Sequence, residues 1–139
     1  MDTKILSNVA LGTHEDCITK YAKTTINPNR LVILDSTDSE KVTYSGASDL
    51  PFGVAMDEAA ASEELNVALL GCSSTIKIIA GAAIQSGDLI IPGANGTASP
   101  MPTTAGDYIC IGMALSGAAQ GDLAEVLTSI PSQYTVSAS

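Results

Sequence analysis

The sequence contains few aromatic residues and few basic ones. Aromatic side chains make up 4% of the 139 residues, with no tryptophan and a single phenylalanine, Phe52. A hydrophobic core must therefore consist of Ile, Leu, Val and Ala side chains, and we expect it to be thin. Lys and Arg number 6 against 15 Asp and Glu, which gives a net charge of −9. Because nucleic-acid affinity comes mainly from Lys and Arg, this balance argues against a nucleic-acid partner.

Cysteine and histidine are also scarce. Cys17, Cys72 and Cys110 are far apart and form no CxxC pair, which argues against a disulfide framework. His14 is the only histidine, and with Cys17 it lacks the further ligands that a tetrahedral zinc site needs. We therefore expect no metal, no cofactor and no catalytic site. A hydrolase that uses His14 stays an alternative, although a nucleophilic site would have to recruit that residue from near the terminus.

Long apolar runs are missing as well. The longest candidate, IKIIAGAAIQSGDLII, is interrupted by Lys77, Gln85 and Asp88, so it does not reach the ~20 apolar residues that span a bilayer. The first twelve residues, MDTKILSNVALG, contain too short an apolar segment for a signal peptide. We expect a protein that is made in the cytoplasm and has no membrane partner.

Short apolar segments separated by Gly, Pro, Asn, Asp and Ser fill most of the chain after residue 30. This spacing predicts an all-β domain, a sandwich or a small barrel. The stretch DEAAASEEL (57–65) instead favours a single short helix, because Ala and Glu have high helix propensity. The predicted strands are LVILD (31–35), KVTYS (41–45), FGVAM (52–56), LNVALL (65–70), TIKIIA (75–80), DLIIP (88–92), YICIGMAL (108–115) and LAEVLT (123–128).

The two ends differ from this pattern. Residues 1–28 show neither helical nor strand periodicity and end in the turn NPNR (27–30), which predicts an extended N-terminal arm. Residues 29–130 are predicted to form a single β-rich domain. The polar residues 131–139 are predicted to be a C-terminal tail.

Two related stretches raise the question of a ligand loop: AGAAIQSGDLI (80–90) and MALSGAAQGDLAEVL (113–127). A phosphate-binding P-loop needs a Lys that reaches the phosphates, whereas these stretches have no Lys and carry Asp88 and Asp122 in its place. We interpret them as turns. Gly87 and Gly121 supply the unusual backbone conformation, and the two aspartates accept local backbone hydrogen bonds.

A weak internal repeat accompanies these turns. Shifting the sequence by 59 residues aligns GVAMDEAAASEELNV (53–67) with GMALSGAAQGDLAEV (112–126), with five identities that are mostly Gly and Ala. The alignment predicts two similar hairpin-like units, with chance similarity in an Ala-rich chain as the alternative. Close backbone packing is predicted at the small residues of these units, Gly53, Ala55, Gly112, Ala114, Ala118 and Ala119.

Two acidic clusters are candidates for cation binding or acid–base chemistry. The loop LDSTDSEK contains Asp35, Asp38 and Glu40, but it lacks the alternating ligands and the glycine of an EF-hand loop. The second cluster lies within residues 57–64 and shows no sign of a pocket. We interpret the first as a solvated turn and the second as a solvated face.

Several of these phrases occur in an order that is found in a known family. They are Gly-Val-Ala (53–55), AGAAIQSGDLI, the Asn-Gly turn in GANGTASPM (93–101) and GMALSGAAQGDLAEVL (112–127). Over roughly residues 50–128 the series resembles the capsid cement or head-decoration proteins of tailed bacteriophages, especially a short family of them described as a domain of unknown function.

The resemblance implies a compact β-tulip or small-barrel fold without a catalytic motif. It implies self-association, as a homotrimer or alternatively a dimer, on the exterior of the capsid in the virion, where such proteins clamp neighbouring major capsid protein subunits. An N-terminal arm often contributes to this attachment. Here the implied capsid contacts are Thr3, Lys4, Ile5, Leu6, Val9 and Leu11.

A small β-rich carrier or ligand-binding module is the alternative function. AGAAIQSGDLI is similar to turns in biotinyl and lipoyl carrier domains, which modify a Lys at a hairpin tip, commonly after a Met. Lys77 instead lies inside the apolar run TIKIIA, and no Met precedes it.

Overall fold

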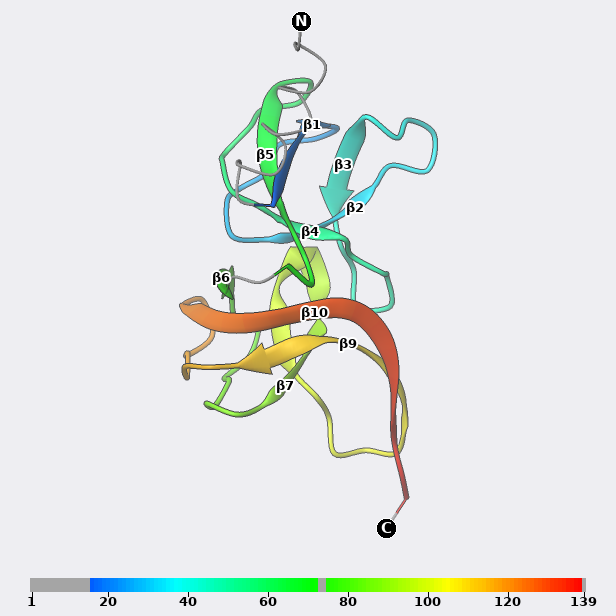
Figure 1. The fold of residues 1–139 in the computed structure, drawn as a ribbon, viewed down its shortest axis with the longest axis vertical. Coiled ribbons are helices and arrows are strands. Elements are labelled where there is room, and N and C mark those ends of the chain that lie inside the picture. Colours follow the sequence, from blue (N-terminus) through cyan, green and yellow to red (C-terminus); the bar gives the residue numbers. More distant parts are fainter. Residues whose placement is uncertain (1–15, 73–74, 139) are drawn as a thin grey trace, which may run out of the picture.

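The chain folds into two β-sheets that lie one above the other (Figure 1). The computed structural model describes residues 16–72 and 75–138. The strands are β1 (Cys17–Ala22), β2 (Leu31–Leu34), β3 (Lys41–Tyr44), β4 (Gly53–Ala55), β5 (Glu64–Leu69), β6 (Thr75–Ile79), β7 (Leu89–Pro92), β8 (Ala98–Pro100), β9 (Gly106–Ala114) and β10 (Leu123–Val136), with a single 3₁₀ turn, η1 (Ala94–Gly96). The all-β fold predicted from the sequence is confirmed, and each of the eight predicted strands is present.

Strands β1–β5 form a closed barrel in the order β1-β3-β2-β4-β5. β1 closes it by pairing antiparallel with β5 and parallel with β3. Alternation along each strand sends neighbouring side chains to opposite faces. Val32, Ala55 and Val67 therefore point into the barrel core, while the residues beside them point outwards. We call this unit the N-terminal barrel.

Strands β6–β10 form a curled sheet in the order β6-β10-β9-β7-β8, which we call the half-barrel. Its two edge strands approach each other at a parallel bridge between Ala80 and Ala98. In the N-terminal barrel the equivalent strands, β1 and β3, form a full parallel pair instead of a single bridge. The two units therefore share one strand order, and they differ in how completely they close.

Backbone hydrogen bonds show that the two units repeat each other. Ile26 and Ala59 exchange both backbone hydrogen bonds at 2.8 and 2.9 Å, and Ile84 and Ala118 do the same at 2.8 and 2.9 Å. Ala59 and Ala118 are the residues that the 59-residue shift aligns.

A second pair of bonds repeats in the same way. The N–H of Ala22 donates to the carbonyl of Glu63, and the N–H of Ala80 donates to the carbonyl of Asp122. The predicted internal repeat is thus confirmed, and it extends beyond the aligned segments to the whole order of strands.

The predicted helix over residues 57–65 is wrong. Ala59 lies in the bridge to Ile26, and Glu64 already belongs to β5. Between them the Ala60 N–H donates to the Glu63 carboxylate at 2.8 Å, and Ser62 has a positive φ of 72°. This tight turn joins β4 to β5, so the tertiary pairing overrides the helix propensity of the Ala and Glu residues.

The predicted arm and tail also need correction. Within residues 1–28, the stretch from Cys17 to Ala22 forms β1 of the barrel, and Ile26 is fully buried. Residues 1–15 lie outside the described residues. At the other end β10 continues to Val136, paired with Gly106 of β9, so most of the predicted tail belongs to the half-barrel sheet.

The core consists of Ile, Leu, Val and Ala side chains, as the composition predicts, and it forms two clusters. One lies inside the N-terminal barrel. The other fills the half-barrel and also contains Leu31, Val54 and Ala68, which point outwards from the barrel. These three residues lie side by side on β2, β4 and β5. We call them the covered row, because the half-barrel packs over them.

Candidate functional site

The two stretches first considered as ligand loops form turns in the structure. Gly87 and Gly121 have φ values of 93° and 90°. The Asp88 carboxylate accepts a hydrogen bond from the Gln85 N–H at 2.8 Å, and the Asp122 N–H donates to the Ala119 carbonyl at 3.0 Å. The first turn connects β6 to β7, which are not neighbours in the sheet, and the second connects the paired strands β9 and β10. Backbone hydrogen bonds also tie these turns to other segments of the half-barrel: the Gly87 N–H donates to the Ala114 carbonyl and the Gly121 N–H to the Ala80 carbonyl, both at 2.8 Å.

The small residues of the repeat permit close approach of strands within the fold. A Cβ atom on Gly112 would meet the backbone carbonyl oxygen of Leu127 on β10, and one on Gly53 would lie 2.6 Å from the carbonyl oxygen of Ala68. Ala55 and Ala114 are buried beside them. Ala118 packs partly buried against the half-barrel core, whereas Ala119 is exposed in the turn.

The implied capsid contacts of the arm cannot be placed. Thr3, Lys4, Ile5, Leu6, Val9 and Leu11 lie outside the described residues, and so does His14. In the part of the chain that is described, no group of three or more His, Cys, Asp or Glu residues could hold a metal ion. That part also contains no helix long and apolar enough to cross a membrane.

The acidic loop between β2 and β3 is held by internal contacts. Lys23 forms an ion pair of 2.7 Å with Asp35, and the hydroxyl of Thr37 donates to the same carboxylate at 2.6 Å. The side-chain hydrogen bonds from Lys23 and Thr37 lower the pKa of Asp35 from its ordinary 3.8 to about 2. The carboxylate therefore favours its charged form through its own neighbours.

This ion pair predicts a pH-dependent contribution to stability. A depressed folded pKa contributes stability above the ordinary value near 3.8, and that contribution is lost as the pH falls towards 2. Lys23→Met is therefore expected to lower the urea midpoint at pH 6 and to match the wild type near pH 2. Lys20→Met is the control, because the Lys20 ammonium donates to the neutral carbonyl of Ser39. An NMR titration in which Lys23→Met left the pKa of Asp35 unchanged would contradict this assignment.

Lys77, the candidate attachment point of a carrier domain, lies in the middle of β6. Its cross-strand partner is Glu125 of β10. Carrier domains present the modified lysine at the tip of a hairpin, so the position of Lys77 does not favour the carrier alternative.

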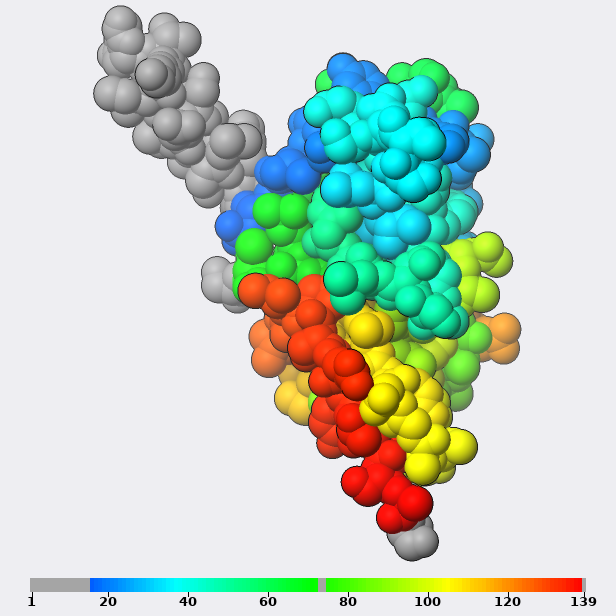
Figure 2. Space-filling model, turned by 90° about the vertical axis from the view of Figure 1, so that its right-hand side faces the viewer, coloured from blue at the N-terminus to red at the C-terminus, as the bar shows by residue number. Residues whose placement is uncertain are grey.

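The most prominent feature of the surface is a two-stranded ribbon, formed by Gly106–Cys110 of β9 and Ser132–Val136 of β10. It continues beyond the pairs that β9 makes with β7 and that β10 makes with β6. In Figure 2 its yellow and red strands narrow to one end of the molecule. Tyr108 and Tyr134 form a direct cross-strand pair on it, and Tyr134 is 44% exposed.

A groove runs along the base of the ribbon. Its volume is about 480 Å³, and its walls come from the turn after β3, from β7 and from both ribbon strands. The lining residues are Ala47, Ser48, Ile91, Asp107, Tyr108, Ile109 and Gln133. The groove thus combines apolar and aromatic surface with a few polar groups, as protein-binding surfaces commonly do.

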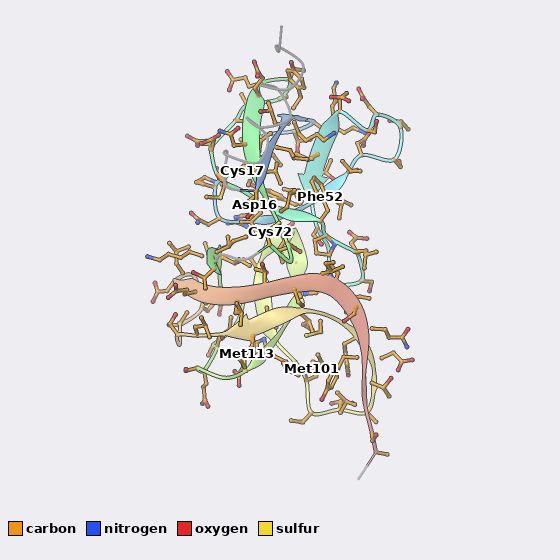
Figure 3. The ribbon with its side chains drawn as sticks, in the orientation of Figure 1. Asp16, Cys17, Phe52, Cys72, Met101 and Met113 are labelled. Carbon is orange, nitrogen blue, oxygen red and sulfur yellow. The ribbon has the colours of Figure 1, made fainter. Side chains whose placement is uncertain are left out.

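Exposed apolar side chains also gather on the outer face of the half-barrel. Leu89, Met113 and Leu127 are cross-strand neighbours on β7, β9 and β10. Met113 is 37% exposed and Leu127 43% exposed. We call these three residues the open row; Figure 3 labels Met113 on β9.

Sequence reasoning missed the ribbon and the open row. The open row combines one residue from each of three separate segments, and only strand register brings them together. The ribbon lies partly in the segment predicted to be a tail. The alternation of Tyr134 and Val136 with polar residues was the available signal for this extension.

Residues 12–130 match the family model described as phage cement protein. The chain belongs to the phage cement protein family. It is a structural protein of a phage head. Among curated proteins no sequence matches it. Among solved structures it is similar to "head fiber gp8.5 N base in bacteriophage phi29", with a TM-score of 0.66, 24% identity and coverage of 81% of this chain and 92% of that one. At this identity the likeness shows a shared fold for the cement protein.

Proposed function

We propose that this protein is a capsid cement, or decoration, protein that binds the outer surface of a phage head, where it bridges major capsid subunits and stabilises the shell. In this role it acts as a homotrimer, without catalytic activity and without nucleic acid or membrane as partner. Membership of the cement family supports the proposal.

The observation that carries the proposal is the projecting ribbon with the groove at its base. A two-stranded ribbon is marginally stable by itself in water, so one that projects from its sheet gains from a partner surface. Tyrosine supplies large contact area at low conformational cost and is enriched at interaction hot spots. The pair Tyr108–Tyr134 places two such side chains side by side on the ribbon. We therefore place the capsid contact of the folded body at the ribbon.

Tyr134→Ala is expected to weaken binding to undecorated expanded capsids by about tenfold or more, as for a hot-spot residue. The measurement is co-sedimentation with capsids over a range of protein concentrations. Tyr21→Ala is the matched control, because Tyr21 is 39% exposed against 44% for Tyr134 but lies on the N-terminal barrel. If the two variants bind capsids equally well, the ribbon is not part of the capsid contact.

A variant that lacks residues 1–12 separates the arm from the body. If the arm adds to the attachment, this variant binds more weakly than the wild type and loses further affinity on Tyr134→Ala. If the full-length protein does not sediment with capsids at all, the cement function fails. Intact mass tests the carrier alternative, since biotin or lipoate on Lys77 would favour it.

A further inference from the structure

The internal repeat relates the covered row to the open row, residue for residue. Leu31 and Leu89 are 58 positions apart, and Val54 and Met113 are 59 apart, as are Ala68 and Leu127. The pairings repeat as well: Leu31 pairs with Val54 as Leu89 pairs with Met113, and Val54 pairs with Ala68 as Met113 pairs with Leu127. The two rows therefore occupy equivalent positions on equivalent strands, and both face outwards.

The two rows differ in what lies over them. Leu31 and Val54 are fully buried and Ala68 is 7% exposed, because the half-barrel packs on them. In the open row Met113 and Leu127 are 37% and 43% exposed. The side chains of the open row are apolar although they are exposed. Where the covered row has Ala68, the open row has the larger Leu127.

More apolar surface surrounds the open row. Leu115 and Leu123 are 44% and 45% exposed; Leu123 lies on β10, four positions before Leu127, and Leu115 follows directly after the end of β9. Side chains two or four positions apart on a strand share a face. Leu123 therefore shares a face with Leu127, and Glu125 and its cross-strand partner Lys77 lie on that face as well. A row of exposed apolar side chains beside such a charged pair marks an interaction surface more often than scattered exposed residues do.

We infer that a second copy of this chain covers the open row. The contact already present in the molecule supports this inference, because the fold buries the equivalent row against another unit of the same fold. The inference rests on the self-association included in the proposed function and assigns it to one face. It also separates that face from the ribbon, which is left for the capsid.

The same comparison indicates whether the contact joins identical or different surfaces of the two copies. Within one chain the covered row packs against the core side of the half-barrel, not against the open row. A closed trimer likewise requires each subunit to present two different surfaces to its neighbours, whereas a twofold dimer brings identical surfaces together. We therefore expect the open row to pack against a different surface of the neighbouring copy.

Met113→Lys is the test, with sedimentation velocity of the purified full-length protein over a range of concentrations. The wild type is expected to sediment as an oligomer of the 14.1 kDa chain, and Met113→Lys as the monomer, with the self-association constant reduced at least about tenfold. Leu127→Glu is a second variant on the row. The control is Met56→Lys, because Met56 is 44% exposed but lies just after β4, outside both rows, and it is expected to leave the oligomer intact.

Each result decides the matter. A monomeric wild type overturns the inference, as does an oligomer that persists in both row variants or that Met56→Lys disrupts equally. Circular dichroism of each variant establishes that it is folded. Capsid co-sedimentation of the same samples keeps the two proposals apart. A monomeric wild type that binds capsids removes the inference and the homotrimer but leaves the cement function, and an oligomeric wild type that does not bind capsids removes the cement function alone.

Discussion

Gly112→Ala is expected to destabilise the fold by roughly 3 kcal/mol or more, through overpacking together with backbone strain. Gly112 has a φ of 151°, which favours glycine, and a Cβ atom there would meet the carbonyl oxygen of Leu127 and lie 3.0 Å from the Cα of Thr128. Both contacts are with the backbone of β10, which cannot rotate away as a side chain can. The strand pair would have to separate at the point where the half-barrel sheet continues into the ribbon.

Gly121→Ala is the matched control for this change. Gly121 also has a positive φ, 90°, but no other atom lies within 4 Å of an added Cβ. Gly121→Ala is therefore expected to lower the free energy of unfolding by about 1–2 kcal/mol, through backbone strain alone. Urea unfolding at neutral pH compares the two variants with the wild type. If Gly112→Ala costs no more than Gly121→Ala, close strand packing at Gly112 contributes little to stability.

Leu31→Ala is expected to cost about 2–5 kcal/mol, and the equivalent Leu89→Ala less than about 1.5 kcal/mol. Leu31 is fully buried between the N-terminal barrel and the half-barrel, so its truncation leaves a cavity. Leu89 is half-buried in the open row, where its loss exposes little new surface within one chain. The same substitution at equivalent positions thus measures the contact between the two units.

Thermal and urea unfolding of both variants, at concentrations low enough to keep the chain monomeric, give the comparison. A cost for Leu89→Ala equal to that for Leu31→Ala would mean that the covered row contributes no more than its exposed counterpart. At high concentration Leu89→Ala is expected to lose additional stability, because an interface between copies then contributes to the apparent unfolding free energy.

Much of the fold was predictable because apolar strands and their turn residues repeat along the chain. The strands that sequence reasoning missed have specific physical reasons. In β1, Lys20 occupies a partly buried position, and its ammonium group donates to the Ser39 carbonyl at 2.9 Å. Because a lysine stands where an apolar residue is expected, this barrel strand shows no clean apolar alternation. β8 spans only Ala98–Pro100, which is too short to produce a pattern.

The functional surface was less predictable than the fold. The turns at Gly87 and Gly121 could be interpreted from local chemistry, because each contains a hydrogen bond of its own, to the Asp88 carboxylate and from the Asp122 N–H. The backbone hydrogen bonds that tie these turns to distant segments, such as that from Gly121 to Ala80, were not predictable in this way. The open row and the Tyr108–Tyr134 pair depend on strand register, which is set by long-range pairing. Whether an outward-facing leucine is covered or open depends further on where the second unit packs, and nothing near Leu31 or Leu89 in the sequence distinguishes them.

The duplication also bears on the order of events during synthesis. Every strand pair of the N-terminal barrel lies within residues 17–69, so all its partners have been made before β6 begins. At ~5–20 residues per second, the strands of the half-barrel follow several seconds later. The strands that bury the covered row are therefore made after the barrel that presents it.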